Sequence, residues 1–162
     1  MTSVIDFDAL WTRVAALSTS LMHGIDHWRR VERNGLILAE RTGADVEVVR
    51  LFAIFHDSRR LHDGTDHGHG ARGAELAASW RGVFFDLPDD RFESLRYACV
   101  WHTDQTHHSD PTIGSCWDAD RLDLGRVGIQ PDPRWMSTDY GRELAARAAR
   151  GALEARNRKK NG

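Results

Sequence analysis

Hydrophobic residues recur along this chain at the three- and four-residue spacing of amphipathic helices, and strand-like alternation is weak. The first apolar stripe predicts a helix from Asp6 to Leu21. A second helix is predicted from Asp26, as its N-cap, to Thr42, where Gly43 ends it. The first stripe consists of Phe7, Leu10, Trp11, Val14, Leu17 and Leu21.

A third helix, Val46–His56, differs from the first two because its apolar residues lie nearly all round it. Asp45 is in the position to cap its start. A helix without a polar face has to be surrounded by protein, so we expect this one at the centre of a helical bundle.

The remaining helices are separated by two polar segments that lack any periodicity, Ser58–Gly70 and Thr103–Thr112. Ordered polar loops on a rigid scaffold often carry function. The pattern predicts one all-α domain over residues 1–162, with about six to seven helices and a core over about residues 20–140. The later helices are expected at Ala71–Trp80, from Pro88 to about His102, at Ile113–Asp123, and over about 137–157 with Ser137 or Thr138 as the cap.

Composition narrows the class of protein. The 162 residues suit one domain, and 41% hydrophobic with 28% charged residues is ordinary for a globular chain. The net charge of −2 gives no reason to expect a nucleic-acid polymer or a membrane as partner. No run approaches the ~18 apolar residues of a membrane span. The start of the sequence lacks the pattern of a signal peptide. Two isolated cysteines provide no disulfide framework. We therefore expect a cytoplasmic protein.

Histidine is the residue type that stands out, with nine residues in three clusters. His27 lies in the opening turn of the second predicted helix, and His56 with Asp57 ends the third. Antiparallel helices joined by a short connection bring the start of one beside the end of the next. We therefore expect His27, His56 and Asp57 at the same end of the bundle.

Other histidines and aspartates are expected near the same end. His69 opens the fourth helix and His102 closes the fifth, while Asp120 lies in the sixth. Mixed nitrogen and oxygen donors suit Mn²⁺, Fe²⁺, Co²⁺, Ni²⁺ or Zn²⁺ better than Ca²⁺. Spacing alone leaves competitors for three of these positions, namely His67 for His69, His107 and His108 for His102, and Asp118 and Asp123 for Asp120.

The ordered set of His27, the His56-Asp57 pair and a downstream ADRLD run containing Asp120 resembles the signature of HD-domain metal-dependent phosphohydrolases. The resemblance covers about residues 20–140 and implies a helical bundle with one or two divalent transition-metal ions. It also selects His69 and His102, which look like the additional histidines of members with two ions. The ligand set that it implies is His27, His56, Asp57, His69, His102 and Asp120.

The same resemblance implies hydrolysis of a phosphate ester, with a nucleotide or another small phosphorylated molecule as substrate. Asp57 is then the catalytic residue, which orients a water molecule and accepts its proton. Guanidinium groups bind phosphate well, and several lie near the expected ligands in sequence. The expected substrate-binding residues are Arg30, Arg60, Arg72 and Arg121.

Two other functions fit the same ligands. A few HD-fold proteins with six such ligands hold two irons and use O₂ on an organic substrate, and others are regulatory modules that bind a nucleotide without cleaving it. Complete ligands favour an enzyme over a regulatory module. A homodimer is compatible with the sequence, which predicts no particular oligomer.

Overall fold

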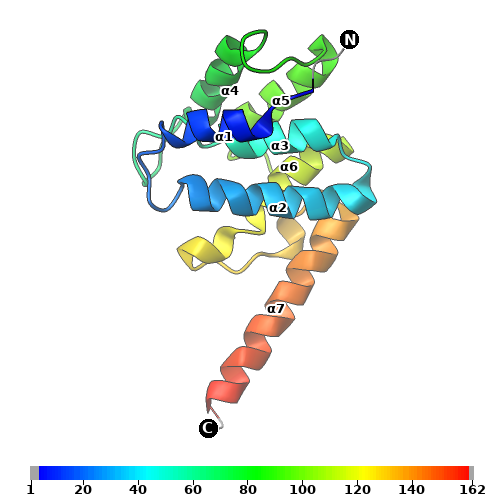
Figure 1. Cartoon of the computed structure of the whole chain (residues 1–162). Coiled ribbons are helices and arrows are strands. Elements are labelled where there is room, and N and C mark those ends of the chain that lie inside the picture. Colours follow the sequence, from blue (N-terminus) through cyan, green and yellow to red (C-terminus); the bar gives the residue numbers. More distant parts are fainter. Residues whose placement is uncertain (1–3, 161–162) are drawn as a thin grey trace.

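The structure is a computed structural model that describes residues 4–160, in which five helices pack around α3 and the last helix projects from the bundle (Figure 1). The predicted all-α fold is confirmed, and within the described range the one strand-like feature is an isolated bridge between Arg81 and Phe85. No helix there has the length and apolar composition needed to cross a membrane. The elements are α1 (Phe7–Ala15), α2 (Ile25–Thr42), α3 (Val46–Phe55), α4 (His69–Trp80), α5 (Asp89–Trp101), α6 (Pro111–Arg121), the 3₁₀ turns η1 (Leu124–Val127) and η2 (Pro133–Trp135), and α7 (Asp139–Lys160).

Helix α3 occupies the centre, as its apolar sequence predicts. Leu51, Phe52, Ile54 and Phe55 are completely buried, and α3 packs against α1, α2, α4, α5 and α6. The carboxylate of Asp45 caps its first turn by accepting from two backbone amides. Because α3 is fixed on all sides, the residues at its carboxyl end are held rigidly in the interior.

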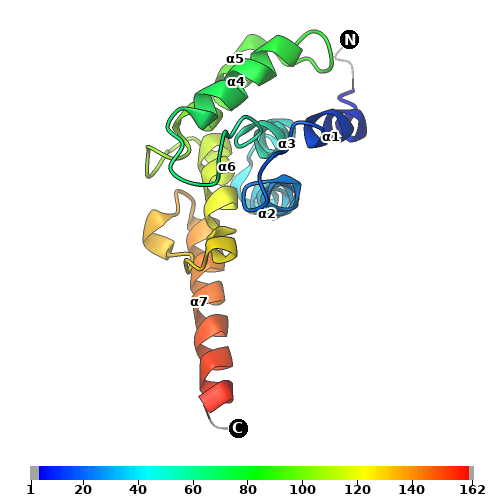
Figure 2. The ribbon, with the colours of Figure 1, turned by 90° about the vertical axis from the view of Figure 1, so that its left-hand side faces the viewer.

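Two glycines let α4 approach the ends of its neighbours. A Cβ at Gly70 would clash with the carbonyl oxygen of Cys99 near the end of α5, and one at Gly73 would clash with that of Phe55 at the end of α3. Helices α4 and α5 therefore pack closely, side by side (Figure 2). This packing brings the start of α4 to the ends of α3 and α5.

Two details of the N-terminal region differ from the prediction. The first helix ends at Ala15, and Leu21 is 99% exposed rather than part of the buried stripe. The chain turns directly after the helix, with backbone bonds from Leu17 N to Val14 O and from Ser18 N to Ala15 O, and Ser20 Oγ then accepts from the amide of His23. Helix α2 has Gly24 as its N-cap, and the predicted cap, Asp26, lies in its first turn.

Helix α7 leaves the bundle and projects away from it (Figures 1 and 2). Gly141 and Ala145, both near its start, are its buried residues, and the helix continues to Lys160. Of the two predicted caps, Thr138 accepts from the amide of Gly141 at 2.9 Å. The start of α7 is attached to α6 through the buried carboxylate of Asp118, which accepts from Ser137 N at 2.6 Å and from both Thr138 N and its hydroxyl, at 2.9 and 2.7 Å.

The Asp118→Ala variant is expected to lose about 3 kcal/mol of unfolding free energy, because it leaves the partly buried backbone amides of Ser137 and Thr138 without their charged acceptor. The measurement is chemical denaturation followed by circular dichroism. The matched control is Asp104→Ala, at an exposed aspartate, which should unfold at nearly the wild-type denaturant concentration. Equal stability of the two variants would contradict the role given to Asp118.

Candidate metal centre

The structure brings together all six residues that the sequence nominates as metal ligands. They come from the start of α2, the end of α3, the start of α4, the end of α5 and the end of α6, so five helices meet at this point. They form two groups of donor atoms with Asp57 in both. The first contains His27, His56 and Asp57, and the second contains Asp57, His69 and His102.

In the first group, the Nε2 atoms of His27 and His56 lie 3.2 Å apart. Oδ2 of Asp57 is 3.5 Å from the former and 3.7 Å from the latter. Asp120 joins this group, since its Oδ1 lies 3.2 Å from His27 Nε2 and 3.8 Å from His56 Nε2. Ligands held about 2.1 Å from one ion are separated by roughly 3 Å or somewhat more, so these four donors have suitable spacing.

The second group uses the other oxygen of the same carboxylate. Asp57 Oδ1 lies 3.2 Å from His69 Nε2 and 3.6 Å from His102 Nε2. These two histidine nitrogens are 3.0 Å apart. One carboxylate therefore faces two sets of imidazoles, one with each oxygen, which is the arrangement of a bridging ligand.

Each of the four histidines has its ring fixed through its other nitrogen. Nδ1 of His27 lies 2.7 Å from Asp123 Oδ2, and Nδ1 of His56 faces two carbonyl oxygens of α3. Nδ1 of His69 lies 2.6 Å from the carbonyl oxygen of Asp66, and that of His102 lies 2.7 Å from that of Cys99. Because these partners are acceptors, each Nδ1 carries the proton and each Nε2 presents its lone pair to the centre.

This orientation fits a cation. Two unprotonated Nε2 atoms that face each other at 3.0 or 3.2 Å repel, unless a metal ion or a proton lies between them. In addition, Asp120 Oδ1 is buried and has no hydrogen-bond partner among residues 4–160, which is costly for a carboxylate. A divalent metal ion in each ligand group would satisfy these atoms, so the residues present fit the metal ions that the sequence predicts.

In the protein without metal, a proton on His27 takes the place of the cation. Burial lowers the pKa of His56 to about 3, so its ring stays neutral and able to act as a ligand. Burial would also lower the pKa of His27, but three nearby carboxylates raise it to about 10, led by Asp120 and Asp123. A proton on His27 and a metal ion therefore compete for the same position.

The competing residues lie elsewhere. His67 is exposed, and His107 is exposed with Nε2 at 2.8 Å from the carbonyl oxygen of Arg134. His108 is half-buried and packs against Trp117, with its Nδ1 accepting from a backbone amide. Asp118 ties α6 to α7 instead of facing the centre. The geometry therefore selects the six candidates over these alternatives.

Asp123, which the sequence offered as a competitor of Asp120 for the ligand position, has another part in the centre, as the partner of His27. It accepts from His27 Nδ1 with one oxygen and, at 2.7 Å, from Arg30 Nε with the other. The signal available was its place three residues after Asp120, where the helix end leaves it on the same side.

Replacing Asp123 by asparagine is expected to weaken metal binding by roughly tenfold, because the amide holds the His27 ring less firmly and lowers its basicity. Competition with a chelating dye for Mn²⁺ measures this affinity. Asp26→Asn, which changes an exposed aspartate on the same helix as His27, is the matched control. Unchanged affinity in Asp123→Asn would show that the carboxylate does not support His27.

The four arginines predicted to bind substrate have different surroundings. Arg60 lies closest to the centre, with its Nε 3.3 Å from Asp57 Oδ1. Arg30 is paired with Asp123, and Arg72 forms two hydrogen bonds with Asp66, at 2.6 and 2.7 Å. Arg121 donates to backbone carbonyl oxygens of the segment after α5 and of Trp135. Arg72 and Arg121 therefore have structural partners, and Arg60 is the one of the four beside the shared carboxylate.

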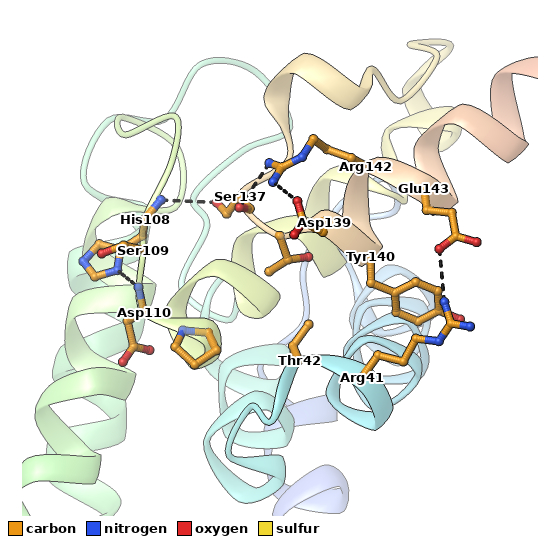
Figure 3. Close-up of a pocket in the computed structure, with 12 residues that line it drawn as sticks. Arg41, Thr42, His108, Ser109, Asp110, Ser137, Asp139, Tyr140, Arg142 and Glu143 are labelled. Atoms are coloured by element: carbon orange, nitrogen blue, oxygen red, sulfur yellow. Dashed lines mark hydrogen bonds and ion pairs between the residues drawn. The ribbon is translucent and has the colours of Figure 1, made fainter.

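A cavity of about 400 Å³ opens next to the second ligand group, and its lining includes His23, Arg60, His69 and Thr103. Thr103 Oγ1 lies 3.4 Å from His69 Nε2, so the cavity reaches the candidate ligands directly. A somewhat larger cavity, of about 460 Å³, lies between the end of α2, the segment before α6 and the start of α7 (Figure 3). None of the six candidate ligands lines that second cavity, and its Arg41 is paired with Glu143. The first cavity is therefore the candidate substrate site.

Imidazoles and carboxylates from five helix ends around one shared carboxylate define an all-helical protein with a candidate metal centre. The chain belongs to the HD-domain family, whose model matches residues 24–125, a range that contains all six candidate ligands. This confirms the predicted family and bundle.

Similarity to a solved structure extends the comparison to nearly the whole chain. The fold is similar to the crystal structure of a predicted HD superfamily hydrolase from an uncultured Thermotogales bacterium, with a TM-score of 0.77 and 24% sequence identity. The alignment covers 97% of this chain and 92% of the other. At this identity the likeness establishes the fold alone. None of the curated proteins compared with the chain matches it.

Proposed function

We propose that the protein is a metal-dependent hydrolase that cleaves phosphate esters of small molecules, such as nucleotides or other phosphorylated metabolites. The observation that carries the proposal is the position of Asp57, with one oxygen among His27 and His56 and the other among His69 and His102. A carboxylate shared by two ligand groups is typical of sites that activate water and bind phosphoryl oxygens. The Thermotogales protein of similar fold, described as a predicted hydrolase, is consistent with this.

The residues that would hold the cofactor are the six candidate ligands, and their nitrogen and oxygen donors favour Mn²⁺, Fe²⁺, Co²⁺, Ni²⁺ or Zn²⁺. When bound, such ions lower the pKa of water and withdraw charge from phosphoryl oxygens. The chain contributes orientation. Asp57 is almost completely buried, and the surrounding histidines hold its pKa well below its ordinary value despite that burial. Its ionised carboxylate accepts a hydrogen bond from the attacking water and directs it.

The charges beside the candidate ligands are balanced, although Asp63, Asp66 and Asp104 also line the cavity. Three carboxylates and three guanidinium groups lie together, so their charges cancel, and the charge of any bound cation remains to attract an anion. Arg60 is placed to donate to a phosphoryl oxygen, because it lines the cavity and contacts Asp57. The carboxylates are those of Asp57, Asp120 and Asp123, and the guanidinium groups are those of Arg30, Arg60 and Arg126.

The test is elemental analysis of the purified protein followed by a screen of phosphate esters with each of the five metals. We expect bound transition metal and metal-stimulated release of inorganic phosphate. Bound iron with oxygen consumption and no phosphate release would instead favour an oxygenase with two irons. Nucleotide binding without any turnover, in fully loaded protein, would favour a regulatory module.

A further inference from the structure

His23 is a buried histidine at the candidate centre that belongs to neither ligand group. It lies in the turn before α2, and 9% of its surface is exposed. Its Nδ1 is 3.4 Å from Asp57 Oδ2, and its ring stands perpendicular to that of His27, with 6.2 Å between the ring centroids. The amide of His23 donates to Ser20 Oγ, which fixes the turn. A buried imidazole in this position requires a hydrogen-bond partner.

Arg126, on η1, is that partner. Its Nη2 lies 3.3 Å from His23 Nδ1, and its Nη1 donates to the carbonyl oxygen of Asp123 at 3.1 Å. A guanidinium only donates hydrogen bonds, so His23 Nδ1 accepts here and the ring proton is on Nε2. The side chain of Arg126 is 11% exposed, and its Nε is buried with no hydrogen-bond partner in the described part of the chain.

His23 also lines the 400 Å³ cavity beside the second ligand group, together with Arg60. Nδ1 faces the protein, so the opposite edge of the ring, with Nε2–H, is the edge left for the cavity. Arg60 contacts Oδ1 of Asp57, and His23 lies beside Oδ2. Arg60 and His23 therefore lie on either side of the shared carboxylate, and both line the cavity that a ligand would enter.

We propose that His23 is a substrate-binding residue that donates its Nε2–H to the anionic group of the substrate, and that Arg126 is the positioning residue that fixes the tautomer of His23. The inference deepens the proposed function and rests on it for the identity of the substrate as a phosphate ester. The hydrogen bond itself requires only that an oxyanion enters the cavity. Inorganic phosphate is therefore a suitable probe.

The first test measures the affinity of the Mn²⁺-loaded protein for inorganic phosphate by calorimetry. Loss of one hydrogen bond to a charged group is expected to weaken phosphate binding by roughly tenfold in His23→Leu, with the metal content unchanged. His23→Gln keeps an N–H donor near the position of Nε2 and should recover most of the affinity. The matched control is His62→Leu, at an exposed histidine of the neighbouring loop that does not line the cavity.

The second test observes the ring of His23 directly. In the Zn²⁺-loaded protein, long-range ¹H–¹⁵N NMR should show His23 with its proton on Nε2. Arg126→Met should change this tautomer population and weaken phosphate binding, whereas Arg126→Lys, which keeps a charged donor, should restore part of both. A purely structural role for Arg126 would change thermal stability without changing the tautomer.

Three results would overturn the inference. The first is a phosphate affinity of the metal-loaded His23→Leu variant within about twofold of that of the wild type. The second is a wild-type His23 that carries its proton on Nδ1. The third is loss of metal from His23→Leu, which would make His23 a ligand. Absence of phosphate-ester hydrolysis together with phosphate binding that depends on His23 would reject the proposed function and leave this inference standing.

Discussion

Replacing Asp57 by alanine is expected to eliminate phosphate release, with a loss of roughly a thousandfold or more, because it removes the one carboxylate that both ligand groups share. The metal content should fall in both groups, since each loses a donor oxygen and the four imidazoles lose the negative charge that faces them. Phosphate release under saturating metal and elemental analysis of the same preparation measure the two effects.

The control for this experiment is Asp8→Ala, which removes an exposed aspartate of α1 far from the centre in sequence and should leave metal content and activity unchanged. Circular dichroism establishes that both variants are folded. Activity within about tenfold of wild type in Asp57→Ala would contradict the central role that we give to this carboxylate.

His56→Ala is expected to have the second large effect. His56 is completely buried, and its ring lies between Phe52, on which it stacks, and the rings of His27 and His102. Its loss removes a ligand from the first group and leaves a cavity, so metal binding by that group and most of the hydrolysis should disappear. His69 and His102 remain, so the residual metal content should approach that of the second group alone.

The metal-to-protein ratio of His56→Ala, measured beside wild type and the exposed-site variant His107→Ala, decides this point. A full complement of metal in His56→Ala would exclude His56 from the ligand set. Unfolding free energies should be measured as well, because removal of a buried imidazole also costs packing.

The positions of the ligands could be predicted because they lie at helix ends. His27 opens α2 and His56 ends α3, and the three-residue connection after Thr42 makes those ends neighbours. The ends of helices follow from caps and periodicity, which are local properties of the sequence. For Asp120, the choice among three aspartates needed the resemblance to a family, since periodicity does not separate it from Asp118 and Asp123.

The surroundings of the ligands could not be predicted in the same way. Arg121 donates to backbone carbonyl oxygens, and Arg72 pairs with Asp66. A sequence pattern does not reveal which carbonyl oxygens a loop will expose. Arg126 reaches His23 across 103 positions of sequence because η1 turns back towards α2. Such contacts depend on the path of irregular segments, where no periodic signal exists.

The early end of α1 could not be predicted from periodicity either. Leu17 and Leu21 continue the apolar spacing of the helix, but the chain turns after Ala15, and Ser20 Oγ accepts from the amide of His23 further on. Serine hydroxyls commonly form such local bonds in turns. The segment that results carries His23 to the centre, where we propose that it binds substrate.

The projecting part of α7 has a practical consequence. Beyond Ala145 the helix buries no residue, so its outer turns depend on their own hydrogen bonds and should exchange amide protons far faster than α3. Cargo such as a fluorophore or an immobilisation handle could be attached along these turns without disturbing the interior. Because the helix points away from the bundle, such a handle would hold the bundle and its candidate metal centre clear of a sensor surface.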